Sequence, residues 1–128
     1  MPVDLTTAAA RRSEWLESAN ERIDHLAELP HNWDGYGSPA ISQPALDGAA
    51  QLMSFLASEL PPIPTVGPVP GGGLQLEWRH GVRELELELL PNGTIEYLTV
   101  ECSEMREDTL ALADFGTALK LVRWVLED

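Results

Sequence analysis

The sequence predicts an α+β fold with two N-terminal helices, a three- to four-stranded antiparallel β-meander and a C-terminal helix. Apolar residues recur at helical spacing in the first half of the chain and again in its last twenty or so residues. Between them, residues 74–101 alternate apolar and polar side chains, as half-buried strands do. A chain of 128 residues fits one domain, here residues 1–128, with a substantial core.

The first half of the chain predicts a helical hairpin over residues 6–60. Residues 6–29 place Trp15, Ala19 and Ile23 on one helical stripe, and Pro30 ends the helix. Residues 43–60 form the second helix, with Ser42 as its N-cap. A loop of residues 30–42 joins them, which allows the two helices to pack together. The apolar stripe expected on the second helix is Leu46, Ala49, Ala50, Met53, Leu56 and Leu60.

A connector rich in proline and glycine, residues 61–73, leads into an antiparallel sheet predicted over residues 64–102. Residues 64–69 are expected to form an irregular edge strand, because proline cannot serve a central one. His80-Gly81 and Asn92-Gly93 are both typical of two-residue hairpin turns. Two such turns define three consecutive strands, each paired with the next.

These turns predict a register for the sheet. The first places Leu76 opposite Leu85, and the second places Leu85 opposite Val100 and Leu87 opposite Leu98. Apolar side chains then share one face, and a slip of one residue would bury acid. The residues expected on the opposite, solvated face are Glu77, Glu84, Glu86, Glu88, Tyr97 and Glu101.

The third predicted helix covers residues 110–127. Its main apolar stripe is Phe115, Leu119, Val122 and Leu126. Leu121, Trp124 and Val125 make a second side apolar as well. A helix that is apolar on most sides is either buried or meets another chain. A homodimer through this helix is therefore one expectation.

The charge balance restricts the kinds of partner. The chain has 8 Lys and Arg against 21 Asp and Glu, a net charge of −13. This opposes direct binding of nucleic-acid phosphates and of anionic membranes, and it favours a basic protein partner. A single cysteine, Cys102, excludes an intramolecular disulfide, and no signal peptide is recognisable at the N-terminus. We therefore expect a cytoplasmic protein.

No residue pattern predicts catalysis or a cofactor. His25, His31 and His80 are scattered, without the spacing that metal ligands require. Cys102 has no histidine nearby in sequence, and the glycines at 71–73 lack the lysine of a phosphate-binding loop. We expect no catalytic, cofactor-binding or metal-binding residue, and no enzyme activity.

The loop of residues 31–39, with sequence HNWDGYGSP, has two interpretations. In the structural one, Trp33 fills the core while Asn32 and Asp34 accept hydrogen bonds from backbone amides. In the functional one, Trp33 and Tyr36 are rigid anchors for a partner. The structural interpretation is the expected one, because these residue types usually build turns.

Three motifs together resemble a family of small uncharacterised bacterial proteins. They are LPHNWDGYGSP at residues 29–39, GGLQLEW at residues 72–78 and PNG at residues 91–93. The resemblance covers about residues 26–98 and implies no catalytic residue. It implies an accessory role, since such proteins are often found with mobile or defence genes.

Two functional hypotheses follow. The first is a protein-binding module, like an antitoxin, an immunity protein or an accessory subunit, whose acidic sheet face contacts a basic partner or imitates nucleic-acid phosphates. The second is a small-molecule-binding or enzymatic domain with a pocket near Trp33, Tyr36 and Trp78. The predicted partner-binding residues are Glu77, Glu84, Glu86, Glu88, Tyr97, Trp33 and Tyr36.

Overall fold

The computed structural model describes residues 5–111 and 113–128. Its helices are α1 (Leu5–Ala27), α2 (Gln43–Leu56), a short 3₁₀ helix η1 (Ala57–Glu59) and α3 (Phe115–Leu126). Its strands are β1 (Thr65–Val69), β2 (Gly73–His80), β3 (Arg83–Leu89), β4 (Ile95–Glu101) and β5 (Glu104–Thr109). The α+β prediction is confirmed, but the sheet has five strands rather than three or four.

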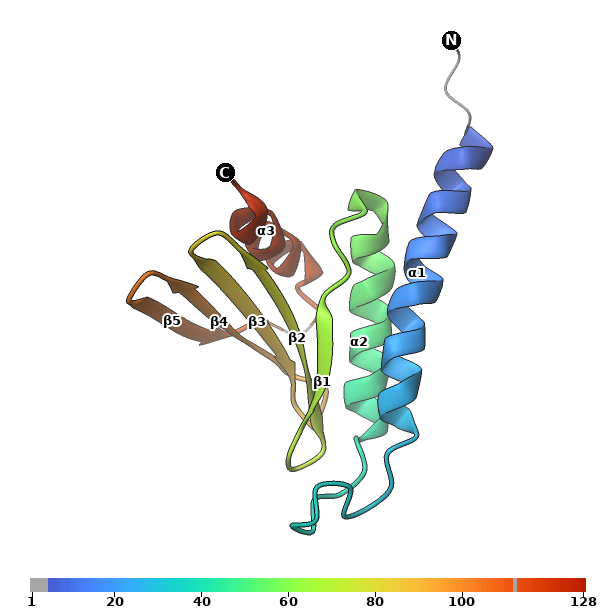
Figure 1. Cartoon of the computed structure of the whole chain (residues 1–128), viewed down its shortest axis with the longest axis vertical. Coiled ribbons are helices and arrows are strands. Elements are labelled where there is room, and N and C mark those ends of the chain that lie inside the picture. Colours follow the sequence, from blue (N-terminus) through green and yellow to red (C-terminus); the bar gives the residue numbers. More distant parts are fainter. Residues whose placement is uncertain (1–4, 112) are drawn as a thin grey trace.

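The strands form one antiparallel sheet in the order β1-β2-β3-β4-β5. Helices α2 and α3 contact β2, β3 and each other, so they cover one face, which we call the inner face. Helix α1 packs on α2 and lies beside β1 (Figure 1). Within the described chain, no helix packs on the other face of β2–β5, the outer face.

The core lies between the inner face and the helices. Trp15, Ala19 and Ile23 are buried on α1, as their spacing predicts. On α2 the buried stripe is shifted from the predicted one and comprises Ala45, Ala49, Leu52, Met53 and Leu56. Leu60 is exposed, because the α-helix ends at Leu56 and Leu60 adopts a left-handed φ of 48°. The sheet contributes Leu74, Leu76, Trp78, Leu85, Leu87, Leu89 and Ile95.

Two tryptophans hold the proline-rich connector. The indole N–H of Trp15 donates to the carbonyl of Pro61 at 2.5 Å, and that of Trp78 donates to Pro62 at 2.8 Å. Proline has no N–H of its own, so a run of prolines relies on side chains or water to satisfy its carbonyls. These two bonds fix the path of the chain from α2 into β1.

The β2–β3 hairpin differs from its predicted register by two residues. Leu76 lies opposite Leu87 rather than Leu85, and the loop is Gly81-Val82 rather than His80-Gly81. Gly81 has a φ of 60°, which suits glycine in such a turn. A shift of two residues leaves every side chain on its predicted face.

The β3–β4 hairpin differs by one residue, which reverses the faces of β4. The loop has three residues, Pro91-Asn92-Gly93, instead of two. The N–H of Gly93 donates to the carbonyl of Leu90 at 2.8 Å, and Gly93 has a φ of 88°. This is the geometry of a tight turn followed by a left-handed residue. Leu87 therefore faces Tyr97.

The reversal corrects the predicted positions of Tyr97, a predicted site residue, and of Glu101. Tyr97 lies opposite Leu87 and Glu101 lies opposite Arg83, so both side chains project from the inner face. The prediction that they share the acidic face was wrong. Leu98 and Val100, expected in the core, lie on the outer face instead.

Strand β5 and the start of α3 also differ from expectation. Residues 104–109 lack apolar alternation, yet they pair along β4 with every side chain exposed. Helix α3 begins at Phe115 rather than at residue 110. Asp114 caps it by accepting the N–H of Thr117 at 3.1 Å, while the N–H of Leu110 still donates to Ile95 in β4.

Candidate functional site

The outer face is the main candidate site. Cross-strand neighbours form three rows from β2 to β5. They are Glu77, Glu86, Leu98 and Glu107; Arg79, Glu84, Val100 and Met105; and Gln75, Glu88, Glu96 and Thr109. Six of these twelve positions are glutamate and one is basic. The predicted clustering of Glu77, Glu84, Glu86 and Glu88 on one face is confirmed.

The carboxylates on this face are close enough to affect each other. Burial, and then the nearby Glu77 and Glu84, raises the pKa of Glu86. Burial, and then Glu96 directly opposite, raises the pKa of Glu88. Arg79 offsets part of the repulsion, since its Nε lies 2.5 Å from a carboxylate oxygen of Glu77. At neutral pH the folded protein therefore bears a cost for keeping this face charged.

Replacing Glu86 and Glu88 by glutamine should stabilise the protein at pH 7, by about 0.2–1 kcal/mol per residue. A carboxyl whose pKa is raised above its ordinary 4.5 binds more protons folded than unfolded, so its ionisation lowers stability as the pH rises above that value. The gain should disappear at about pH 4, where both states are largely protonated. Thermal unfolding of wild type and variant at both pH values measures this. An equal gain at both would exclude repulsion as the cause.

Apolar side chains adjoin the acid on the same face. Leu98 and Val100 are half-buried and Met105 is 62% exposed. A hollow of about 380 Å³ lies over β3, β4 and β5. Its lining residues are Glu86, Glu88, Glu96, Tyr97, Leu98, Glu107, Asp108 and Thr109. Leu98, Val100 and Met105 thus form a small apolar strip on the outer face, and carboxylates surround it.

The loop of residues 30–42 is held mainly by its own polar groups. Asp34 Oδ1 accepts the N–H of Tyr36 at 2.9 Å and that of Ser38 at 3.2 Å. Asn32 Oδ1 accepts the N–H of Gly37 at 2.7 Å. The hydrogen bonds that Asp34 accepts lower the pKa of its carboxyl, the bond from the Ser38 hydroxyl most. The predicted roles of Asn32 and Asp34 are confirmed.

The two aromatic residues of this loop are not in the core. Trp33 is half-buried and its indole N–H donates to Pro39 in the same loop at 3.2 Å, so the prediction that it fills the core was wrong. Tyr36 is 93% exposed. Trp78 is buried on β2. It lies about six residues from the end of the sheet that meets this loop, which is roughly 20 Å along the strand. The structure does not bring these three aromatic residues into one pocket.

The three motifs of the resemblance meet at one end of the fold. Ser42, which follows the first motif, donates its N–H to Gly72 at 2.9 Å and its hydroxyl to Pro91 at 2.6 Å. A side chain on Gly72 would meet Pro39 and Pro91, each 3.6 Å from the added carbon. These contacts give the motifs a shared structural role in joining the loop to two turns of the sheet.

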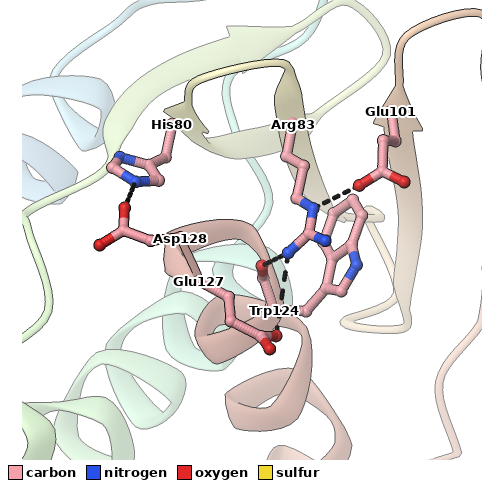
Figure 2. Close-up of polar contacts among 6 residues, drawn as sticks. All are labelled: His80, Arg83, Glu101, Trp124, Glu127 and Asp128. Carbon is pink, nitrogen blue, oxygen red and sulfur yellow. Dashed lines mark hydrogen bonds and ion pairs between the residues drawn. The ribbon is translucent and has the colours of Figure 1, made fainter.

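Arg83 joins the other end of the sheet to the C-terminal end of α3 (Figure 2). Its guanidinium lies 4.9 Å from the ring centroid of Trp124 and donates to the Trp124 carbonyl at 2.8 Å. It also pairs with Glu101 and lies 3.8 Å from a carboxylate oxygen of Glu127. A cation at a helix C-terminus satisfies carbonyls that have no partner in the helix.

Residues 5–111 and 113–128 contain no group of three or more His, Cys, Asp or Glu side chains arranged to hold a metal ion. Their helices include none with the length and apolarity needed to cross a membrane. The apolar side chains that suggested a dimer through α3 pack against the core.

Comparisons with protein-family models, with curated proteins and with solved structures find no match for this chain. The resemblance to small bacterial proteins therefore stays a prediction.

Proposed function

We propose that this protein is a small binding module, like an antitoxin, an immunity protein or an accessory subunit, that contacts a basic protein partner through the outer face of its sheet. The surface would comprise Glu77, Glu84, Glu86 and Glu88 with the neighbouring apolar strip. Tyr97, from the inner face, would reach it only at the hollow that it helps to line. Trp33 and Tyr36 form a second predicted contact at the loop.

One observation carries the proposal: an uncovered sheet face combines mutually repelling carboxylates with half-buried Leu98 and Val100. A face meant only for water would gain from polar or basic residues at these positions, which relieve repulsion and expose less apolar surface. A basic partner would neutralise the glutamates and cover the apolar strip. An apolar centre with a polar rim is the usual anatomy of an interface.

The test is to neutralise Glu84, Glu86 and Glu88 together as glutamines. The protein is immobilised, proteins captured from a cell lysate are identified, and their affinities are measured at several salt concentrations. Wild type should capture basic proteins whose affinity falls with salt. The triple variant should associate about tenfold more slowly, because the steering field is weaker.

A matched control separates this face from net charge. Changing Glu14, Glu17 and Glu21, all exposed on α1, to glutamine removes the same charge elsewhere. The control should retain wild-type affinity at each salt concentration. If both triple variants lose the same affinity, net charge alone governs binding and the proposed site is wrong.

A further inference from the structure

Strand β5 is the open edge of the sheet. It pairs with β4 and contacts no other element of the described chain, and all six of its side chains are exposed. It lies at the edge farthest from α1 (Figure 1). The other edge, β1, lies against α1 and contains Pro68, which lacks an N–H. A further strand can therefore join at β5 far more readily than at β1.

The ladder defines which backbone groups of β5 point outward. Just past the end of β5, the N–H of Leu110 donates to the carbonyl of Ile95 at 2.8 Å. Backbone groups alternate direction along an antiparallel strand, so every second residue before Leu110 also points toward β4. The residues between them, Met105, Glu107 and Thr109, direct their N–H and carbonyl groups to the open edge.

One of these outward groups is already used. The N–H of Thr109 donates to Oδ1 of the preceding Asp108 at 2.8 Å. The N–H and carbonyl groups of Met105 and Glu107 are then the ones presented for pairing. This gives a short docking edge of two outward residues.

The charges of the edge select among possible occupants. Glu104, Glu107 and Asp108 are acidic and Arg106 is basic, so the strand carries a net charge of −2. A second copy would place two such strands side by side, within a protein whose net charge is −13. Like charges on neighbouring strands repel, whereas a basic segment would be attracted.

We propose that a basic, extended segment of the partner adds to β5 as a sixth strand and bonds to the backbone of Met105 and Glu107. The inference rests on the proposed function and names how the partner engages. Adding a strand to an open edge gives affinity through the main chain and specificity through alternate side chains. Hollows of about 380 and 340 Å³ border β5 and leave room for those side chains.

The experiment uses a capped peptide of about eight residues in which lysine and threonine alternate, a basic sequence suited to a strand. Its control is the same peptide N-methylated at every second residue, which keeps the charges but removes the donors along one edge. We expect the parent peptide to slow amide exchange of Met105 and Glu107. We expect the methylated peptide to bind about tenfold more weakly, because it cannot complete the ladder.

Two variants test whether the peptide binds at the open edge of β5. Glu107→Pro removes an outward N–H without touching the bonds to β4, since proline is tolerated on edge strands. Glu107→Thr removes the same charge but keeps the N–H. Glu107→Pro should bind the parent peptide more weakly than Glu107→Thr does, because it lacks the N–H that donates to a carbonyl of the peptide.

Several outcomes would overturn strand addition. Equal binding of the two peptides, with shifts confined to the glutamates of β2 and β3, would leave the proposed function standing and exclude the edge. Absence of peptide binding would exclude an extended basic segment, while capture of a folded basic protein would still test the proposed function. A wild-type dimer that Glu107→Pro converts into a monomer would identify a second copy as the occupant. If Glu107→Pro does not fold, the comparison of the two peptides on the wild-type protein still tests strand addition.

Discussion

Truncating Trp78 to alanine should lower the free energy of unfolding by about 3–5 kcal/mol. The side chain is 3% exposed and packs in the core beneath the sheet. Its indole N–H also holds the carbonyl of Pro62 at 2.8 Å. The substitution therefore leaves a large cavity and releases the connector between α2 and β1. Equilibrium unfolding in denaturant measures the loss, and a change below about 1 kcal/mol would contradict this account.

The matched comparison is Trp33→Ala. The sequence placed Trp33 in the core, where its truncation would be equally costly. In the structure Trp33 is half-buried and bonds within its own loop, so the cost should be about 1 kcal/mol. If this variant unfolds normally but loses a partner, the loop is a binding site. If it destabilises as much as Trp78→Ala, the loop is part of the core.

The sequence predicted those elements whose burial is periodic. Helices α1 and α2 and strands β2 and β3 each expose one face and bury another, so their apolar spacing carries the signal. Strand β5 is exposed on both faces, and its sequence Glu-Met-Arg-Glu-Asp-Thr carries no such signal. Only its pairing with β4 makes it a strand. The same holds for the start of α3, where Leu110 remains paired to β4 although its neighbours suit a helix.

The sequence predicted the acidic face correctly on the strands whose register shifted by two residues, and incorrectly on the strand whose register shifted by one. The β2–β3 turn shifted by two residues, so the glutamates on these strands kept their face. The β3–β4 loop contains Asn-Gly, which favours two residues, but the preceding Pro91 fits the first position of a longer turn. One extra loop residue moved Tyr97 inward and Leu98 outward. Helical spacing predicted the burial of Trp15, but a loop has no such periodicity, so the half-buried position of Trp33 could not be predicted in the same way.

The second large effect is expected on partner binding, when Leu98 and Val100 on the outer face are changed. Changing both to threonine should weaken binding of the captured basic partner by about 2 kcal/mol, roughly 30-fold in Kd. Both lie half-buried between the glutamates of β3 and the residues of β5, near the centre of the outer face. Truncations at the apolar centre of an interface usually cost more than changes at its charged rim. Threonine keeps a strong preference for strands, so the fold should lose about 1 kcal/mol or less.

Val82→Thr is the control for this pair, because it makes the same change on an exposed valine. Val82 is 64% exposed in the β2–β3 turn and takes no part in the rows of the outer face. Binding should be unchanged in this variant, and titration calorimetry on the purified partner compares the three proteins. Full affinity in the double variant would mean that the apolar strip faces only water. Since the strip is the feature that distinguishes this face from a merely soluble acidic surface, that result would remove the main support for placing the partner there.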